Sequence, residues 1–466
     1  MKTIKTNELD SLNLDYKNIV NSTLDVVDES ILILDHQDEA KLNELVSSSL
    51  KLNPKLILTS NLCKIENNKI IILENFYESF RYVLNKIYDN YLDLSYYGVT
   101  GTNGKTTTCY FINQLIGESN LLVGTVDEKD LFQFTNETHL TTPKLFNLVK
   151  LLSLSSKSVE SVAIEVSSHA LDQNRLRDLK FRVSGFTNLS QDHLDYHGSL
   201  DKYFEAKSKL FNNNVSEKFV YIDSEYGNLL KNNTKIPSYS VGLREENDIQ
   251  LIQYSSEEDV IKFRIEDSYV ESNTSFMGPK FVENFLLAFG MLYFSEEYDL
   301  NKLINNIPLV CNPPGRFQLI CKNNKNVIID YAHTPEAISE VINFALEKYN
   351  KVVTIVGAGG NRDSSKRKFM GNSLSNSSKV ILTNDNPRKE NPLEIAREIL
   401  SGIPLNKDVE IVLDRYQAIK QGINLIKNDE VLLVLGKGHE KYQEINGEHF
   451  EFSDGKVVEE ILELSK

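Results

Sequence analysis

A glycine-rich segment that ends in lysine and threonine offers the chain's clearest chemistry: Gly98-Val99-Thr100-Gly101-Thr102-Asn103-Gly104-Lys105-Thr106-Thr107-Thr108. Glycines let the backbone turn tightly, so that successive N–H groups point at phosphate oxygens, and Lys105 adds a positive charge. Thr106 offers a hydroxyl to Mg²⁺. Because Val99 stands where the strict phosphate-loop pattern has its first glycine, the alternative is a strand-to-helix turn without a ligand. The segment predicts binding of a nucleoside triphosphate, a property that many unrelated enzymes share.

A second group of polar residues follows the apolar run Val162-Ala163-Ile164, and it begins Glu165-Val166-Ser167-Ser168-His169. An acidic residue that ends a strand in a phosphate-loop protein is well placed to bind Mg²⁺ directly or through water. Further on, residues 187–198 contain His193 among aspartates, and residues 203–211 contain Lys207. A histidine among aspartates is more often part of a polar surface turn than a ligand. The order of phosphate loop, strand-end glutamate and Asp-His nevertheless favours a metal site.

Short apolar runs that alternate with helical patterns are expected to position these residues. Such an alternation predicts α/β architecture with mainly parallel sheets, whose carboxyl ends form sites. A helix is expected over residues 107–116, directly after the phosphate loop. The expected strands are Ile31-Leu32-Ile33-Leu34, Val162-Ala163-Ile164, Phe219-Val220-Tyr221-Ile222, Val327-Ile328-Ile329, Val352-Val353-Thr354-Ile355-Val356 and Val431-Leu432-Leu433-Val434-Leu435.

Two breaks divide the 466 residues into three expected domains. One lies just before the glycine-rich segment, and the other at Asn312-Pro313-Pro314-Gly315, where a Pro-Pro-Gly break precedes a new strand–helix series. We therefore expect a small N-terminal α/β domain over residues 1–92. A central domain of the phosphate-loop ATPase type over residues 93–313 and a C-terminal Rossmann-like domain over residues 314–466 follow it.

Charge and composition exclude several classes of partner. The formal net charge is −15, which argues against nucleic acid because phosphate backbones require broad basic surfaces. No apolar stretch is long enough to span a membrane, and the first ten residues lack the apolar core of a secretory signal. Four scattered cysteines (Cys63, Cys109, Cys311 and Cys321) have no metal or redox spacing and are typical of free thiols. A cytoplasmic protein is expected.

Taken in order, these segments resemble the Mur ligase family, and within it the branch of UDP-N-acetylmuramoyl-tripeptide synthetases. The resemblance covers residues 97–454, and coincidence becomes negligible because all pieces occur in family order. The further pieces are Thr141-Thr142-Pro143, Gly315-Arg316-Phe317, Asp330-Tyr331-Ala332-His333-Thr334-Pro335, Gly357-Ala358-Gly359-Gly360-Asn361-Arg362-Asp363, Asp385-Asn386-Pro387-Arg388 and Gly436-Lys437-Gly438-His439-Glu440.

The resemblance implies the nucleotide and metal contacts residue by residue. Lys207 matches a lysine that becomes carbamylated (N6-carboxylysine); adding CO₂ to a neutral amine makes an anion that binds metal, and a buried lysine loses its proton readily. The alternative is an exposed helix lysine, as we expect Lys209 to be. The implied metal ligands are Thr106, Glu165, His193 and Lys207, which together with Lys105 form the catalytic set. The implied ATP contacts are Gly101, Thr102, Asn103, Gly104, Lys105, Thr106, Thr107, Asn284, Arg316 and Asp330; for Arg316 or Asp330 alone, a salt bridge between domains is the alternative.

The resemblance also implies two sets of substrate contacts. An arginine after a Ser-Ser-His turn suits an anionic substrate. Where the family usually has Asp-Ser-Arg near the uridine, this chain has Asn21-Ser22-Thr23, so only Ser22 is carried over. The set expected to hold UDP-N-acetylmuramoyl-L-Ala-D-Glu is Ser22, Thr141, Thr142, Ser168, Gln173 and Arg175.

The element Asp-Asn-Pro-Arg (residues 385–388) accompanies meso-diaminopimelate as the added amino acid in the family, whereas lysine-adding members lack the arginine. Diaminopimelate carries a second carboxylate that the Arg388 guanidinium can grip through two hydrogen bonds. Lysine would leave Arg388 unpaired, which predicts discrimination. A plain turn with a solvated arginine is the alternative. The set expected around this amino acid is Arg362, Asp385, Asn386, Pro387, Arg388, Gly436 and Glu440, where Glu440 takes the distal ammonium.

The expected reaction is ATP- and Mg²⁺-dependent amide bond formation through an acyl phosphate, in peptidoglycan precursor synthesis, by a monomer. Three alternatives remain beside addition of diaminopimelate: addition of L-lysine, a ligase similar to folylpolyglutamate synthases, and a homologue that binds substrate without turnover. A phosphate-loop switch protein would need neither the candidate carbamate lysine nor the amino-acid site.

Overall fold

The structure is a computed structural model that describes residues 2–125, 140–155, 159–190, 192–255, 258–275, 278–362 and 364–464. The chain forms two compact units, residues Met1–Lys105 with Ile116–Ser238, and residues Thr106–Leu115 with Tyr239–Lys466. Gln191 and Asp363, which stand in the motifs quoted above, lie outside the described residues. The mixed α/β class is confirmed, while the domain boundaries after residues 92 and 313 stay predictions.

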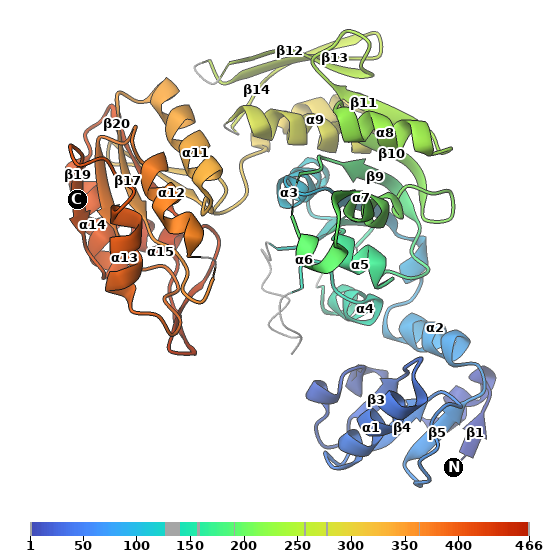
Figure 1. Ribbon diagram of the computed structural model, residues 1–466. Helices are drawn as coiled ribbons and strands as arrows, with labels where there is room; N and C mark the ends of the chain where they lie inside the picture. Colours follow the sequence, from blue (N-terminus) through green and yellow to red (C-terminus); the bar gives the residue numbers. More distant parts are fainter. Residues whose placement is uncertain are drawn as a thin grey trace. The chain divides into compact units, whose positions relative to one another are not determined.

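The first unit begins with a sheet of parallel strands in the order β1-β5-β4-β3-β2 (Figure 1). Buried side chains line both faces, and one face packs under α1 through Leu42 and Val46. The strands are β1 (Lys2–Ile4), β2 (Ile19–Val20), β3 (Ile31–Leu34), β4 (Leu56–Thr59) and β5 (Ile70–Leu73). The helices are α1 (Glu39–Leu50) and α2 (Phe76–Ile87), with single 3₁₀ turns η1 (Thr6–Leu12), η2 (Tyr16–Asn18), η3 (Thr23–Asp25) and η4 (Tyr91–Asp93).

A second set of parallel strands in the first unit runs in the order β10-β9-β6-β8-β7. Its carboxyl edge carries the phosphate loop after β6 and Glu165 at the end of β8. The strands are β6 (Ser95–Thr100), β7 (Asn120–Val123), β8 (Ser161–Glu165), β9 (Phe181–Phe186) and β10 (Ser216–Ile222). The helices are α4 (Leu145–Leu154), α5 (Ser168–Asp172), α6 (Leu194–His197), α7 (Leu200–Ser208) and α8 (Glu225–Asn233).

The second unit contains most of α3, a group of largely antiparallel strands and the C-terminal sheet. The strands β12, β13 and β14 pair antiparallel, and β11 pairs parallel with β12, so the sequence prediction of mainly parallel pairing missed this part. The elements before the C-terminal sheet are α3 (Lys105–Ile116), β11 (Ser238–Gly242), β12 (Ile249–Ser255), β13 (Val260–Ile265), β14 (Ser268–Asn273), α9 (Pro279–Tyr293), α10 (Leu300–Asn306) and η6 (Ile307–Leu309).

The C-terminal sheet has the order β15-β16-β20-β17-β18-β19, and every pair except β15 with β16 is parallel. Its strands are β15 (Gln318–Lys322), β16 (Lys325–Asp330), β17 (Lys351–Val356), β18 (Lys379–Leu382), β19 (Asp408–Ile411) and β20 (Glu430–Leu435). The helices are α11 (Pro335–Lys348), α12 (Ser365–Ser373), α13 (Pro392–Leu400), α14 (Arg415–Leu425) and α15 (Asp454–Leu464). A separate hairpin joins β21 (Tyr442–Ile445) to β22 (Glu448–Glu451).

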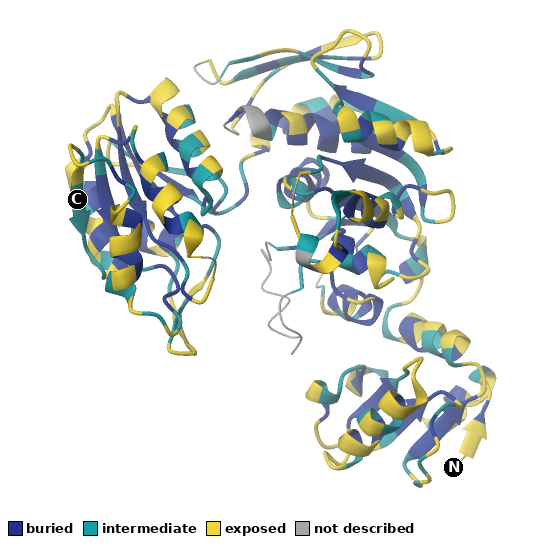
Figure 2. Ribbon diagram, viewed as in Figure 1, coloured by how far each residue is buried: buried dark blue, intermediate teal, exposed yellow. Residues whose placement is uncertain are grey.

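Alternating side chains explain why helices cover both faces of this sheet. In β20, Val431, Leu433 and Leu435 pack with α11, α12 and α13, whereas Leu432 and Val434 pack with α14 and α15. Successive side chains of a strand point to opposite faces, so the unbroken apolar run Val431-Leu432-Leu433-Val434-Leu435 must be covered on both faces. Figure 2 shows the result, with buried strands and helices that are exposed along their outer faces.

All six runs expected to be strands are strands, and the helix expected over residues 107–116 is α3. Among the described residues, no helix is both long enough and apolar enough to cross a membrane.

Candidate functional site

The phosphate loop turns where only glycine fits. Gly101 has φ of +150°, and a Cβ there would lie 1.8 Å from Thr187 Oγ1. Gly104 has φ of +87°, in the left-handed region that favours glycine. Between them, Thr102 N donates to Asn188 O and Asn103 N donates to Asn188 Oδ1, so the segment after β9 braces the loop. The loop then enters α3, whose first-turn amides and dipole favour an anion.

Two lysine side chains converge on one carbonyl of this loop. Lys105 Nζ donates to Gly101 O at 2.9 Å and to Thr102 O at 2.8 Å. Lys207 Nζ donates to the same Gly101 O at 2.8 Å from α7. The positive charge of Lys105 at this end of the loop favours a polyanion such as a triphosphate.

Lys207 is 1% exposed, as expected, while Lys209 is exposed. Its Nζ also lies 4.4 Å from the centre of the Tyr203 ring. Burial, and secondarily the nearby Lys105, hold the pKa of Lys207 well below its usual value, because both penalise the ammonium form. A neutral amine can add CO₂, so the chemistry of this lysine fits carbamylation.

The candidate metal ligands stand at the same carboxyl edge in the first unit. Glu165 is buried at the end of β8, and its Oε1 accepts a hydrogen bond from Thr125 N at 2.6 Å. His193 is exposed in a left-handed turn, and its Nε2 lies 3.4 Å from Asp192 Oδ2. Among the described residues, no three His, Cys, Asp or Glu side chains form a ready metal cluster. This donor set fits Mg²⁺, which takes one or two protein oxygens and fills its other positions with water and phosphate.

Four of the residues expected to hold the muramoyl substrate lie together beside Glu165. Thr142 Oγ1 donates to Glu165 O at 2.7 Å, and Arg175 Nη1 donates to Thr142 O at 2.9 Å. Arg175 Nε also donates to Gln173 Oε1 at 2.9 Å. Ser168 Oγ lies 3.0 Å from His197 Nε2.

Thr141 is half-buried next to this group, whereas Ser22 is remote in sequence and caps the turn η3 by accepting from Leu24 N. An adjoining cavity of about 470 Å³ was not predicted. Arg175 and Gln173 line one side of it, and the N-terminal sheet supplies the other. Arg177 lies 4.2 Å from the ring centre of Tyr77, another lining residue. The lining residues from the N-terminal part are Asn21, Ile33, Leu34, Asp35, His36, Gln37, Phe76, Tyr77, Phe80 and Arg81. Because these residues lie apart in sequence and carry no motif, only the fold could reveal them.

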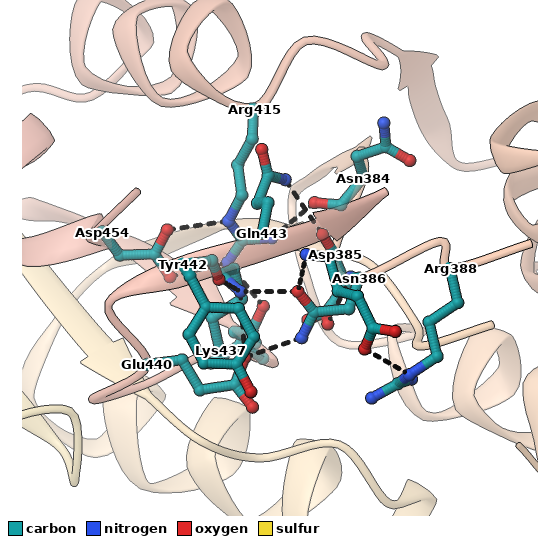
Figure 3. Close-up of polar contacts among 12 residues, drawn as sticks. Asn384, Asp385, Asn386, Arg388, Arg415, Lys437, Glu440, Tyr442, Gln443 and Asp454 are labelled. Atoms are coloured by element: carbon teal, nitrogen blue, oxygen red, sulfur yellow. Dashed lines mark hydrogen bonds and ion pairs between the residues drawn. The ribbon is translucent and has the colours of Figure 1, made fainter. Parts of the chain in front are cut away.

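The residues expected around the added amino acid all follow carboxyl ends of parallel strands in the C-terminal sheet. Arg362 follows β17, residues 385–388 follow β18, and Gly436 and Glu440 follow β20. Asp385 and Pro387 are buried, and a Cβ on Gly436 would lie 2.6 Å from Asp385 Oδ2, so glycine is required there. The structure brings the residues after β18 and β20 into one cluster (Figure 3). Arg362 is exposed.

Lys437 is the centre of this cluster, although the sequence assigned it no role. It is 0% exposed, and its Nζ donates to Glu440 Oε2 at 2.9 Å, Tyr442 O at 2.6 Å and Asn386 Oδ1 at 3.2 Å. Asn386 Nδ2 donates to the same Glu440 Oε2 at 2.7 Å. Glu440 is therefore held through one oxygen, and its other oxygen has no partner among the described residues. The Gly-Lys-Gly-His-Glu motif could have indicated this contact, because its lysine stands three residues before the glutamate.

Arg388 has a protein partner, which corrects the expectation that lysine as substrate would leave it unpaired. Its Nε lies 2.9 Å from Glu444 Oε2, and its Nη1 donates to Gly360 O at 2.9 Å. The two side chains are 21% and 24% exposed, so the pair is largely shielded from water. Discrimination against lysine cannot come from an unpaired guanidinium here.

The remaining nucleotide candidates lie in the second unit. Asp330 ends β16, and its carboxylate accepts from Phe317 N and Ala332 N, both at 2.7 Å. Burial raises the pKa of Asp330, against the opposing effect of Arg316. Arg316 lies over the Tyr331 ring at 4.7 Å, and its buried Nε has no hydrogen-bond partner within the described part of the chain. Asn284 on α9 accepts a long hydrogen bond of 3.4 Å from Thr108 on α3.

Comparison with known proteins agrees with this arrangement. Residues 99–292 match the Mur ligase middle domain, and residues 315–438 match the Mur ligase glutamate ligase domain. Two relatives are named UDP-N-acetylmuramoyl-L-alanyl-D-glutamate–2,6-diaminopimelate ligase. The one from Rickettsia bellii is 35% identical over 89% of this chain and 90% of its own length. The one from Aquifex aeolicus is 38% identical over 79% of this chain and 77% of its own length.

A solved structure with the same name is 28% identical, has a TM-score of 0.66, and covers 96% of this chain and 94% of that chain. The three-domain α/β architecture is thereby confirmed. The chain belongs to the Mur ligase family of ATP-dependent amide ligases.

Proposed function

We propose that the protein joins meso-diaminopimelate to UDP-N-acetylmuramoyl-L-Ala-D-Glu, with hydrolysis of ATP to ADP and phosphate. The observation that supports diaminopimelate as the substrate is the cluster after β18 and β20. It presents the Arg388 guanidinium and the Glu440 carboxylate on either side of Asn386 (Figure 3). A cation and an anion side by side suit an amino-acid head group, which carries both an ammonium and a carboxylate. The names of the relatives support the same substrate.

We assign binding of the three substrates to three parts of the chain. Residues 1–92 contribute to the nucleotide end of the muramoyl substrate, residues 93–313 hold ATP, and residues 314–466 hold the added amino acid. The cavity of about 470 Å³ suits the uridine end. Its apolar rings can pack against a base, and Arg81 and Arg177 can neutralise a diphosphate.

In the first step the free carboxylate of the muramoyl dipeptide attacks the γ-phosphorus of ATP, and ADP leaves with the electrons of the broken P–O bond. Two anions must meet, so Lys105 and the loop amides lower the barrier by neutralising phosphate charge. When bound, Mg²⁺ would supply further charge neutralisation on the phosphates, with Thr106, Glu165 and His193 as candidate ligands.

Lys207 contributes after it has taken up CO₂. Its neutral nitrogen forms a bond to the carbon of CO₂, one C–O π pair moves to oxygen, and the proton on nitrogen passes to water. The carbamate brings a negative oxygen donor to the place where two lysines otherwise meet.

In the second step the amino group of the added amino acid attacks the acyl phosphate carbonyl, and the tetrahedral intermediate collapses with loss of phosphate. Within the C-terminal cluster, Lys437 and Asn386 hold the Glu440 carboxylate in place for the distal ammonium, and Arg388 binds the distal carboxylate. This division of roles needs no covalent nucleophile.

Addition of L-lysine is a second candidate, because Glu444 pairs with Arg388 and removes much of the penalty for a substrate without the distal carboxylate. The test is phosphate release from ATP with UDP-N-acetylmuramoyl-L-Ala-D-Glu, offering meso-diaminopimelate and L-lysine separately. Release that requires diaminopimelate supports the proposal. Release with L-lysine alone would replace the amino acid, and release with neither, from folded protein that binds ATP, would overturn the function.

A further inference from the structure

The hairpin of β21 and β22 is attached to the turn that carries Arg388. Arg388 N donates to Glu444 O at 3.0 Å, and Asn446 N donates to Arg388 O at 2.7 Å. Glu444 N donates to Asn386 Oδ1 at 2.9 Å. One hairpin residue, Glu444, therefore contacts both polar residues of the Asn-Pro-Arg turn through its backbone.

The backbone of Arg388 needs this support. Its φ is +52°, a left-handed conformation that is uncommon for a residue with a long side chain. Such a conformation persists where neighbouring contacts fix it. The two backbone hydrogen bonds to the hairpin provide that restraint and determine where the side chain starts.

The guanidinium is then held at two further points. Glu444 Oε2 forms an ion pair with Nε, and Gly360 O accepts a hydrogen bond from Nη1, each at 2.9 Å. An arginine fixed at Nε and Nη1 cannot rotate about its long axis. Its Nη2 has no partner among the described residues, so the N–H groups of Nη2 are the donors that can bind a ligand.

We propose that Glu444 is a positioning residue that orients Arg388 for the distal carboxylate and thereby contributes to the choice of diaminopimelate over lysine. This inference rests on the function proposed above. The ion pair matters through the direction it imposes, because what Arg388 needs is a fixed direction for Nη2. A side chain immobilised before binding loses less conformational freedom when the ligand arrives, and this raises affinity for that ligand alone.

The experiment compares three variants of the full-length protein with the parent in the phosphate-release assay. Glu444→Ala removes the side chain that contacts Nε, whereas Glu444→Gln keeps a side-chain oxygen at the same position beside Nε. The matched control is Glu451→Ala, which removes an exposed carboxylate of the same hairpin that pairs with Lys456 at 3.0 Å. Thermal unfolding of each variant is measured beside activity.

Glu444→Ala is expected to raise the KM for diaminopimelate about tenfold, with kcat and the KM for ATP nearly unchanged. Glu444→Gln should recover most of that loss, and Glu451→Ala should match the parent. The double variant Glu444→Ala with Arg388→Lys should raise the KM for diaminopimelate little beyond Arg388→Lys alone, because both changes remove the same oriented guanidinium.

An unchanged KM for diaminopimelate in Glu444→Ala would overturn the inference. Equal increases in KM for all substrates, together with a lowered unfolding temperature, would overturn it too, because they indicate a structural role. Additive effects of the two substitutions would also contradict it. Activity of the parent protein with diaminopimelate separates the role of Glu444 from the proposed function. If the parent turns over diaminopimelate, these results bear on Glu444 only; if it does not, the proposed function itself has failed.

Discussion

Two buried lysines, one in each compact unit, show how the same side chain can be given opposite tasks. Lys207 in the phosphate region is 1% exposed, and its Nζ donates to the neutral carbonyl of Gly101, which Lys105 also contacts. Lys437 in the amino-acid region is 0% exposed and lies 2.9 Å from the carboxylate of Glu440. Burial is equal in the two places, and the neighbouring charge differs in sign.

The comparison teaches that the partner determines what a buried lysine can do. A second cation beside Lys207 favours the neutral amine, which is a nucleophile toward CO₂. An anion beside Lys437 compensates an ammonium, which is a fixed structural charge. We therefore expect Lys207 to be needed for turnover and Lys437 to be needed for the integrity of its cluster.

The largest expected effect is the loss of turnover in Lys207→Ala. We expect kcat to fall by about 10³-fold, because the carbamate and its charge on the phosphate site are removed together. Added short carboxylates should restore part of the activity by occupying the vacated space. The control is Lys209→Ala, a nearby exposed lysine that pairs with Asp172 at 2.7 Å and should leave kcat unchanged. A fully active Lys207→Ala would contradict the assigned role.

A smaller effect, on stability, should separate the two lysines. Lys437→Met leaves the Tyr442 carbonyl without its donor and the Glu440 carboxylate without its cation, so it should lower the free energy of unfolding by about 2–3 kcal/mol. Lys207→Met breaks one bond to a carbonyl that Lys105 still contacts, and we expect a change within about 1 kcal/mol. Urea unfolding of both variants measures the contrast, and equal losses would refute it.

The smallest expected effect is a pH dependence of the contribution that Lys207 makes to stability. The folded pKa of Lys207 lies below its unfolded value of about 10.4, so the unfolded chain binds more protons over the interval between them. The unfolding free energy of the parent, relative to Lys207→Met, should therefore rise with pH across that interval, by at most about 1.4 kcal/mol per pH unit. Urea unfolding in CO₂-depleted buffers tests this. A difference that stays constant with pH would show that Lys207 titrates normally.

Much of the phosphate region could be predicted because its residues act through the backbone. Glycine at positions 101 and 104 is required by local geometry, and local geometry leaves a signature in the sequence. The expected strands were equally visible, since strands covered on both faces are continuous apolar runs. Mainly parallel pairing is confirmed, and β12, β13 and β14 form the largest antiparallel exception. The alternating burial of β13 is typical of an antiparallel group with one solvated face.

What could not be predicted depends on contacts between side chains far apart in sequence. Glu444 lies 56 positions after Arg388, in a hairpin with no motif, and only the folded chain shows that it meets the guanidinium. The role of Lys437 was hidden for a different reason. A lysine between two glycines resembles an exposed loop residue, and only its burial reveals that it holds Asn386 and Glu440.

The left-handed backbone at Arg388 also limits how this position can change over evolutionary time. A φ of +52° admits glycine, asparagine and aspartate with little strain, but it is costly for valine, isoleucine or threonine, whose branched Cβ clashes with the backbone. A descendant lineage that no longer selected for the distal carboxylate would therefore drift at position 388 toward asparagine, aspartate or glycine. The hairpin that fixes the turn thus also decides which substitutions natural variation can sample there.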